Sequence, residues 1–460
     1  MALSLNQVNI LSNRTQKHFR KPIFDEPREL AFSIFRAVIR DGEYSNLLLP
    51  KKLHSSRLDE RDRALVTELV YGSIRQIGRN DFLAAKFSKI PWTEVDDGIV
   101  DVIRIGAYQL FNTRIPVHAA VSTTVDLARR NLGESKASFV NAIMRRLSEK
   151  SLADHLTEVQ GDSVSELSIR FSHPEWIINS YRDLIPDLEE LKSLLLTNNT
   201  PVAPTLVAWP GRSTQSDLIE LGCRPTKYSE FGGIYEGSPS DLSLIKERQI
   251  GVQDEGSQLV ASIFARAAKE NESWLDLCAG PGGKAALLSA LSTKTFYANE
   301  ISEVRSKLIS QVVTSHTKLT VGDGRQITSA LSKEELETIG AVIADVPCTG
   351  LGALRRRPEV RWRREPTDLP TLTRLQMELA MASIDILPKG GIFAYATCSP
   401  HLAETSMQCA QIEKTQPVEK IDVTPFLPIS LENATRNGYL QLWPQRHGTD
   451  AMFLALYRKR

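Results

Sequence analysis

The stretch SWLDLCAGPGGKAALLSALS, residues 273–292, decides the fold of the second half of the chain. An apolar run of strand length leads into a glycine-rich turn and then a helical pattern, which is typical of the first strand, loop and helix of a parallel α/β sheet. Glycine lets the backbone approach a ligand closely, and the amides at the helix N-terminus point towards it. We therefore expect a ligand site made of Asp276, Cys278, Ala279, Gly280, Pro281, Gly282, Gly283 and Lys284.

Two familiar phosphate-binding loops compete for this turn. A GxxxxGK[ST] loop would need glycine in place of Cys278 and a hydroxyl side chain in place of Ala285, so that interpretation fails. The pattern GxGxx[GA] is satisfied by Gly280, Gly282 and Ala285. It is a weak signal by itself, because any tight turn before a helix can match it.

Acidic residues at the ends of the following strands indicate which ligand the glycine-rich turn binds. Glu300 lies 20 residues after Gly280, where a carboxylate can accept hydrogen bonds from ribose hydroxyls. Asp323 follows the strand-like run KLTV, and Asp345 ends AVIAD. Such acids line one crevice of an open α/β sheet and would repel a ligand rich in phosphates. S-adenosylmethionine, a nucleoside with a sulfonium cation and no phosphate, fits this crevice, with Asp323 near the adenine.

Two of the five cysteines stand beside the same crevice. Cys348 follows Asp345 in DVPCTGLG, and Cys398 follows the next strand in AYATCSP, while Cys223, Cys278 and Cys409 are interpreted as ordinary buried thiols. A thiolate that adds to C6 of a cytosine turns C5 into a nucleophile able to take a methyl group. Asp345 can assist at ring N3, and a second thiol can promote release. The base that removes the C5 proton stays unassigned.

The motifs WLDLCAGPGGKA, ANE, VGDGR, ADVPCTGLGALRRRPEVRW, LQMELA and YATCS together resemble RNA 5-methylcytosine methyltransferases of the NOL1/NOP2/Sun family. The resemblance covers about residues 250–460. It implies that Cys398 is the nucleophile and that Cys348 assists product release. It also implies an S-adenosylmethionine-dependent, Rossmann-like domain.

The front of the chain has a different character. After a basic segment at residues 1–22, expected to be a mobile tail, apolar residues recur at helical spacing and predict an all-α bundle over residues 23–150. Residues 1–150 hold 24 Lys and Arg against 17 Asp and Glu, a net charge of +7, which can attract phosphates. ERDRALVTELVYGSIR, PVHAAVSTTVDLAR and FVNAIMRR resemble the NusB-like RNA-binding domain of the bacterial small-subunit rRNA methyltransferase B subgroup, which implies 16S rRNA as the substrate. Residues 151–249 predict a small α+β linker module.

An arginine-rich segment lies between the two cysteine motifs. LRRRPEVRWRRE holds six arginines and one tryptophan, which suit phosphate contacts and base stacking on an unpaired or flipped nucleotide; a solvated basic turn is the alternative. The candidate RNA-binding residues are Arg355, Arg356, Arg357, Arg361, Trp362, Arg363 and Arg364.

Composition excludes several classes of protein. At 460 residues and 42% hydrophobic content the chain suits two or three globular domains. It has no apolar run of membrane-spanning length and no CxxC pair, so we expect a cytoplasmic monomer without a bound metal. Two alternatives stay open: a transfer RNA cytosine-C5 methyltransferase, and a non-catalytic RNA-binding assembly factor.

Overall fold

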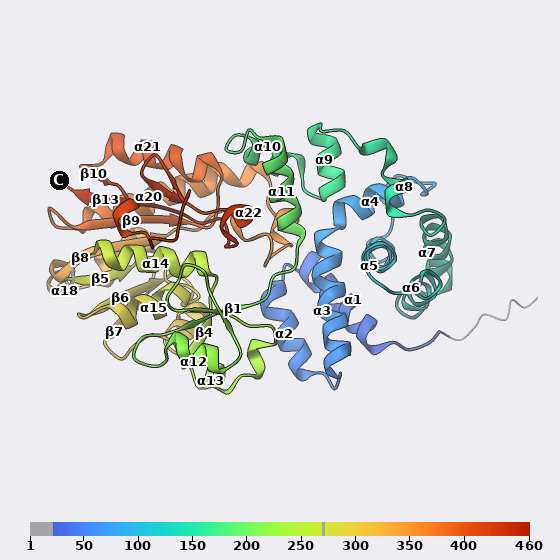
Figure 1. The fold of residues 1–460 in the computed structure, drawn as a ribbon, viewed down its shortest axis with the longest axis horizontal. Helices are drawn as coiled ribbons and strands as arrows, with labels where there is room; N and C mark the ends of the chain where they lie inside the picture. Colours follow the sequence, from blue (N-terminus) through green and yellow to red (C-terminus); the bar gives the residue numbers. More distant parts are fainter. Residues whose placement is uncertain (1–21, 269–271) are drawn as a thin grey trace, which may run out of the picture.

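The computed structural model describes residues 22–268 and 272–460. The predicted tail, residues 1–22, lies outside this range except for its last residue. Figure 1 shows the N-terminal helices at one end of the molecule and a large sheet at the other, with α9, α10 and α11 along the upper edge between them.

The N-terminal part is an α-helical bundle, as predicted. Its helices begin at acidic caps in several places: Asp59 accepts a hydrogen bond from the Asp62 amide, and Asp96 from the Gly98 amide. Their apolar faces share one core that includes Phe35, fully buried. The helices are α1 (Glu26–Ile39), α2 (Ser45–Ser55), α3 (Glu60–Arg75), α4 (Ile77–Ala85), α5 (Asp97–Asn112), α6 (Val117–Leu132) and α7 (Glu134–Leu147).

The middle of the chain contains helices followed by a small sheet, which is the mixed character that the sequence predicts. The strands pair antiparallel in the order β2-β3-β1-β4. The fourth strand comes after residue 249, so the small sheet extends past the predicted end of the linker module. The elements are α8 (Leu152–His155), α9 (Val164–Phe171), α10 (Glu175–Arg182), α11 (Leu188–Asn199), β1 (Thr205–Ala208), α12 (Gln215–Glu220), β2 (Arg224–Pro225), β3 (Gly232–Ile234), α13 (Ser243–Lys246) and β4 (Ile250–Val252).

The C-terminal part is a nine-stranded sheet in the order β11-β12-β13-β9-β8-β5-β6-β7, with β10 paired to β13. The pairs among β5, β6, β7, β8 and β9 are parallel, as the Rossmann-like prediction requires. The last strand, β13, departs from this parallel arrangement, because it lies antiparallel to β9. The strands are β5 (Ser273–Asp276), β6 (Phe296–Glu300), β7 (Thr317–Val321), β8 (Ile339–Asp345), β9 (Ile392–Thr397), β10 (Val418–Ile421), β11 (Thr435–Arg436), β12 (Tyr439–Gln441) and β13 (Phe453–Lys459).

Helices cover both faces of this sheet. Side chains alternate along a strand, so Ile343 of β8 packs in the core that holds α14 and α15, while its neighbour Val342 packs in the core that holds α20 and α21. The helices are α14 (Glu255–Ala267), α15 (Gly283–Leu291), α16 (Glu303–Ile309), α17 (Ile327–Ala330), α18 (Lys333–Thr338), α19 (Val360–Arg363), α20 (Leu369–Asp385), α21 (Ser406–Thr415) and α22 (Pro444–His447). None of the helices in the described ranges has both the length and the apolar character needed to cross a membrane.

Candidate active site

The predicted site residues lie at one edge of the main sheet. Asp276 ends β5, Glu300 ends β6, Asp345 ends β8, and Cys398 directly follows β9. These strands are parallel, so their carboxyl ends face the same side, where open α/β sheets bind ligands. Residues up to 122 positions apart in the chain, Asp276 and Cys398, are therefore placed at one edge.

The two cysteines form a close pair. The sulfur of Cys348 lies 3.4 Å from the sulfur of Cys398, within hydrogen-bond range for thiols. The hydrogen bond from Cys348 lowers the pKa of Cys398 despite its burial, and Lys284 acts in the same direction. The same hydrogen bond, together with burial, raises the pKa of Cys348 well above its usual value. The directions of these pKa shifts favour the proton on Cys348 and thiolate character on Cys398, and in this sense the pair is polarised.

A partly buried ion pair stands beside the thiols. The ammonium of Lys284, in the first turn of α15, lies 2.7 Å from the Asp345 carboxylate. Burial opposes the charge of Lys284, but the attraction of Asp345 outweighs it, and the pKa of Lys284 is raised. The site thus presents a hydrogen-bond donor and an acceptor next to Cys398.

The glycine loop is open enough for a ligand to approach the acids. A Cβ atom placed on Gly280 would lie 2.0 Å from Oε2 of Glu300, so any larger residue there would force this carboxylate to move. The other oxygen of Glu300 forms an ion pair of 2.5 Å with Arg305. Gly282 has a φ of 115°, a conformation that favours glycine, and α15 begins at the next residue. Ala279 and Cys278 lie on the inner side of the loop, where the Ala279 amide bonds to the Asn299 carbonyl.

Asp276 is a buried carboxylate with one oxygen atom left unpartnered by the part of the chain that the structure describes. Its Oδ1 accepts from the Cys278 amide at 3.3 Å, while its Oδ2 is buried and has no hydrogen-bond partner within the described residues. Burial, followed by repulsion from Asp345, raises the pKa of Asp276 to about 7. A buried carboxylate of this kind is stabilised by a cation. The ammonium or sulfonium of S-adenosylmethionine fits that need.

Asp323 lies after the edge strand of the sheet and is paired with an arginine. It follows β7, the outermost parallel strand, and its carboxylate forms a 2.6 Å ion pair with Arg325. That hydrogen-bonded guanidinium lowers the pKa of Asp323. The side chain is ionised and partly exposed, and its contact with an adenine stays a prediction.

Two arginines of this segment differ from the expectation of an RNA-facing cluster because they are buried, whereas the other five candidate residues are partly exposed and their contact with RNA stays a prediction. Arg361 is 0% exposed, and its guanidinium donates to the backbone of Ser172 and Asn198 and to the Asn199 side chain. Burial lowers the pKa of Arg361 to about 9. Arg355 is also buried, 3.6 Å from Asp450. Side chains that are enclosed by protein cannot contact phosphates in this conformation.

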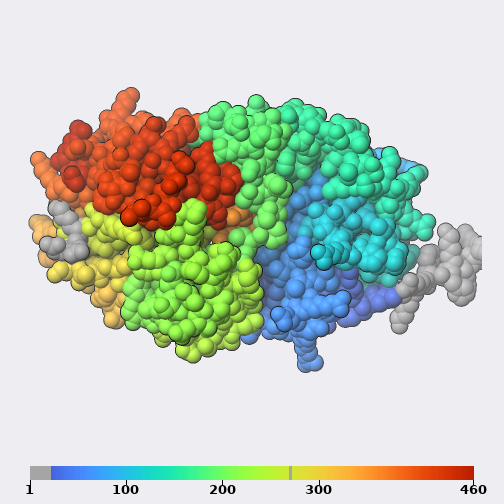
Figure 2. Space-filling view, in the orientation of Figure 1, coloured from blue at the N-terminus to red at the C-terminus, as the bar shows by residue number. Residues whose placement is uncertain are grey.

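Three other residues of the segment, Trp362, Arg363 and Arg357, join the sheet domain to the helical bundle. The Trp362 indole donates to the Ile74 carbonyl at 2.7 Å, and Arg363 donates to the Val38 carbonyl at 2.6 Å. The remaining contacts are those of Arg356 with Asp254, Arg357 with the Tyr44 ring, and Arg364 with the Cys348 carbonyl. Figure 2 shows the N-terminal helices packed against the middle of the chain. Spacing along the chain could not reveal these partners, which come from distant elements.

A buried network that the sequence analysis left without a role lies behind the thiols. Glu404, Gln376 and Thr349 are buried polar side chains that hydrogen-bond to one another. Thr349 and Gln376 lie in two of the motifs that carry the family resemblance, ADVPCTGLG and LQMELA, but those motifs by themselves assign no role to either side chain. Their contacts depend on how three separate elements meet.

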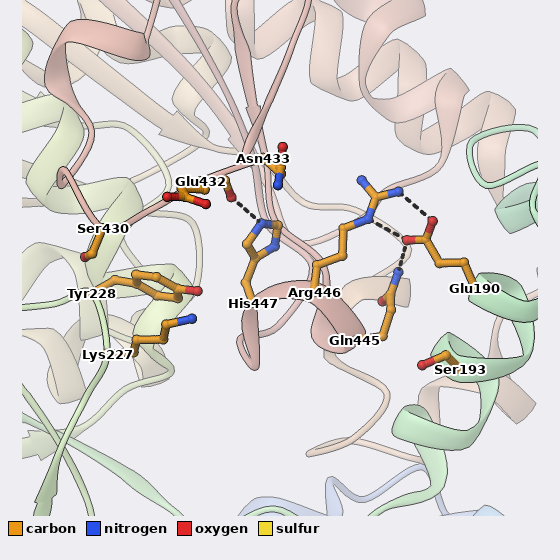
Figure 3. Close-up of a pocket in the computed structure, with 10 residues that line it drawn as sticks. All are labelled: Glu190, Ser193, Lys227, Tyr228, Ser430, Glu432, Asn433, Gln445, Arg446 and His447. Atoms are coloured by element: carbon orange, nitrogen blue, oxygen red, sulfur yellow. Dashed lines mark hydrogen bonds and ion pairs between the residues drawn. The ribbon is translucent and has the colours of Figure 1, made fainter.

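A separate cavity of about 690 Å³ lies away from the cysteines, between α11, the β2–β3 connection and α22 (Figure 3). Arg446 in its wall is held by Glu190 at 2.5 Å, and the His447 ring accepts from the Trp443 amide. Two cations, Lys227 and Arg446, face two carboxylates among its lining residues. The cavity therefore lacks the excess positive charge that a phosphate backbone needs. Among the described residues no group of three or more potential metal ligands is found.

Comparisons with known proteins place this site in a family. Residues 263–458 match the family described as 16S rRNA methyltransferase RsmB/F, and residues 25–149 match the NusB family. A putative methyltransferase of Mycobacterium tuberculosis is 38% identical over 98% of this chain and 100% of its own length. A protein named probable ribosomal RNA small subunit methyltransferase B of Bacillus subtilis is 26% identical over 94% of this chain and 98% of its own.

Solved structures agree in fold. The crystal structure of PH0851 has a TM-score of 0.76 at 19% identity and covers 95% of this chain and 100% of that chain. NSun6 from Pyrococcus horikoshii, crystallised with SFG, has a TM-score of 0.52 at 17% identity, covering 62% and 98%. The chain belongs to the RsmB/F family of S-adenosylmethionine-dependent rRNA methyltransferases, with a NusB-family domain ahead of its catalytic sheet.

Proposed function

We propose that this protein transfers a methyl group from S-adenosylmethionine to C5 of a cytosine in 16S rRNA, through a covalent bond between Cys398 and C6 of the ring. The observation that carries the proposal is the polarised thiol pair, with sulfurs 3.4 Å apart, beside the Lys284–Asp345 ion pair. A close pair of thiols suits a mechanism in which one adds to the ring and the other helps it leave. The family match and the relatives' names support rRNA as the substrate class.

The steps follow from the polarisation of the pair. The Cys398 thiolate adds to C6, which forms an S–C6 bond and makes C5 nucleophilic. C5 then forms a bond to the methyl carbon, and S-adenosylhomocysteine leaves with the electron pair of the broken S–CH₃ bond. A base removes the proton from C5, the C5=C6 double bond reforms, and the Cys398 thiolate is expelled. The Cys348 thiol stabilises that thiolate by donating a hydrogen bond to it.

Lys284 and Asp345 suit the edge of a cytosine. The ring presents acceptors at O2 and N3 and a donor at its exocyclic amine. In the proposed complex Asp345 accepts from the amine or holds the proton at N3, and the ammonium of Lys284 donates to a ring acceptor. A proton held at N3 and a hydrogen bond donated to a ring acceptor draw electrons from the ring and favour thiolate addition, whereas the contact with the amine orients the base.

The cofactor is assigned to the glycine loop. We propose that Glu300 accepts from the ribose, that Asp276 faces the cationic methionine part, and that Asp323 lies near the adenine. S-adenosylmethionine supplies an electrophilic methyl group when it is bound. The remaining loop residues, Cys278, Ala279, Pro281, Gly282 and Gly283, shape the wall of this part of the crevice.

The front domain is assigned to RNA. We propose that residues 23–150 form an RNA-binding domain, residues 151–249 a linker module and residues 250–460 the catalytic domain. The net charge of +7 over residues 1–150, from 24 basic and 17 acidic residues, supports this role. A target base held in duplex RNA must leave the stack to reach Cys398. We propose that it is unpaired or flipped, and that the protein acts as a monomer.

The test is incubation with methyl-labelled S-adenosylmethionine and unmodified 16S rRNA, with transfer RNA as competitor. Nucleoside analysis should find 5-methylcytidine in the rRNA. A preference for transfer RNA would contradict the assignment of 16S rRNA as the substrate. Tight RNA binding without incorporation would favour the non-catalytic alternative, and a different methylated nucleoside would overturn the mechanism.

Single cysteine variants separate the roles of the two thiols. Cys348→Ala should accumulate a covalent protein–RNA adduct on a denaturing gel, because expulsion of the thiolate loses its hydrogen-bond donor. Cys398→Ala should form no adduct, since no thiolate then reaches C6. The opposite pattern would exchange the two assignments, and no adduct with either variant would argue against covalent addition.

A further inference from the structure

The strongest feature outside the thiol pair is a carboxylate buried directly behind it. Glu404 ends a short 3-10 turn, Leu402–Glu404, six residues after Cys398, and is 0% exposed. Its carboxylate accepts from the Thr349 amide at 2.8 Å, from the Thr349 hydroxyl, and from the Gln376 amide at 3.0 Å. Burying a carboxylate is costly, and the cost is offset here by three neutral donors. A buried group of this kind holds its partners in one arrangement.

These contacts attach both sides of Cys348. Thr349, which follows Cys348, donates its backbone amide to Glu404. Pro347, which precedes Cys348, accepts at its carbonyl from Gln376 at 2.9 Å, and the same side-chain nitrogen of Gln376 donates to Glu404. The peptide groups flanking Cys348 are thus bound to one carboxylate–amide pair. Gln376 lies on α20, which packs under β8 and β9.

The same network reaches the second cysteine. Ser399 follows Cys398, and its hydroxyl lies 3.0 Å from the Thr349 hydroxyl. Tyr395 on β9 donates to the Glu404 carbonyl at 2.8 Å and to the Gln376 side chain at 3.2 Å. The loops after β8 and β9 are therefore bound to a single buried centre, and the sulfur atoms project from those two loops.

We propose that Glu404, with Gln376, is a positioning residue that sets the spacing and orientation of the Cys348 and Cys398 sulfurs. Its catalytic consequence rests on the proposed function, whereas the spacing itself does not. Glu404 is enclosed by protein and acts through Thr349 and Pro347 without touching the substrate. A change of this network shifts the thiol pair and leaves the glycine loop, which belongs to β5 and α15, in place.

The first variant is Glu404→Gln. One oxygen of Glu404, Oε1, accepts from both the Thr349 amide and the Gln376 amide, and a glutamine can keep an acceptor at that place. Its nitrogen then faces the Thr349 hydroxyl, which donated to Oε2, so the centre loses its charge and the hydroxyl must turn from donor to acceptor. A gentler second variant is Thr349→Val, which keeps the side-chain shape and removes the hydroxyl shared with Glu404 and Ser399. Thr349→Ser restores that hydroxyl and should recover the wild-type behaviour. The matched control is Glu255→Gln, because Glu255 is a buried carboxylate that also accepts backbone amides, those of Tyr228 and Ser229, in another part of the chain.

The direct readout is the rate at which the two thiols are oxidised to a disulfide, which depends on the distance and orientation of the two sulfurs. A mild oxidant, copper–phenanthroline, takes two electrons and two protons from the thiols and forms a Cys348–Cys398 disulfide, which peptide mass spectrometry detects. Disulfide formation has narrow geometric limits, so Glu404→Gln and Thr349→Val should slow it about tenfold, while Thr349→Ser and Glu255→Gln should not.

The catalytic readout compares two measured quantities, kcat and the affinity for S-adenosylmethionine. Displacement of a reacting group by about 1 Å can cost about 100-fold in rate, so kcat should fall by about this factor in Glu404→Gln with unchanged affinity for S-adenosylmethionine. General unfolding would instead weaken cofactor binding together with kcat. An unchanged disulfide rate in both variants would overturn the positioning role whatever the activity. A slowed disulfide rate in a protein that makes no 5-methylcytidine would keep the positioning role and reject the proposed function.

Discussion

Lowering the pH from 7.5 to 6.0 should weaken the binding of S-adenosylmethionine about eightfold. The cause is Asp276, whose pKa burial and the nearby Asp345 raise to about 7. A cation binds favourably only to the ionised carboxylate. With a pKa of about 7, about 9% of Asp276 is ionised at pH 6.0 and about 76% at pH 7.5, which gives an affinity ratio of about eight.

Isothermal titration calorimetry of the cofactor at several pH values measures this ratio. Asp276→Asn should bind weakly at every pH and lose the slope, because the neutral amide does not titrate in this range. Asp323→Asn is the matched control: Arg325 lowers the pKa of Asp323, so its carboxylate is ionised throughout and its removal should leave the slope intact. A wild-type affinity that does not change between pH 6.0 and 7.5, or a slope retained in Asp276→Asn, would refute the reasoning.

Three further predictions concern stability, the glycine loop and the arginine segment. The pKa of Asp276 is raised, so between about pH 4 and 7 the folded protein without cofactor holds a proton that the unfolded chain has lost, and its stability falls as the pH rises through this window. Asp276→Asn removes the titrating carboxyl and should therefore raise the melting temperature more at pH 8 than at pH 5. An equal effect at both pH values would contradict this. Gly280→Ala places a methyl group 2.0 Å from the Glu300 carboxylate. The affinity for the cofactor, measured by calorimetry, should fall at least about tenfold. An unchanged affinity would show that the loop does not bind the ligand. Arg361→Lys should lower the urea midpoint but leave the salt dependence of RNA affinity unchanged, because a fully buried guanidinium neutralises no phosphate; a decrease of about 0.7 to 0.9 in the slope of log affinity against log salt would restore the RNA-binding interpretation.

The local pattern of the chain was sufficient for the architecture of the site. The strand, glycine turn and helix around Gly280 lie within one stretch of about 20 residues, and their order is a matter of short-range sterics and side-chain periodicity. Acids and cysteines that end parallel strands meet at one edge by the geometry of the sheet alone. For this reason the sequence alone predicts that Asp276, Glu300, Asp345 and Cys398 lie at one edge of the sheet.

Only the tertiary structure decided what the charged and polar residues between these motifs do. The arginines around Arg361 have the composition of an RNA-binding segment, yet most of their partners come from residues 38–75 and 172–205, far away in the chain. The antiparallel direction of β13 and the contacts of Glu404 with Thr349 and Gln376 likewise depend on long-range pairing. Periodicity reports which face of an element is apolar, but burial and hydrogen-bond partners are set by which elements pack together.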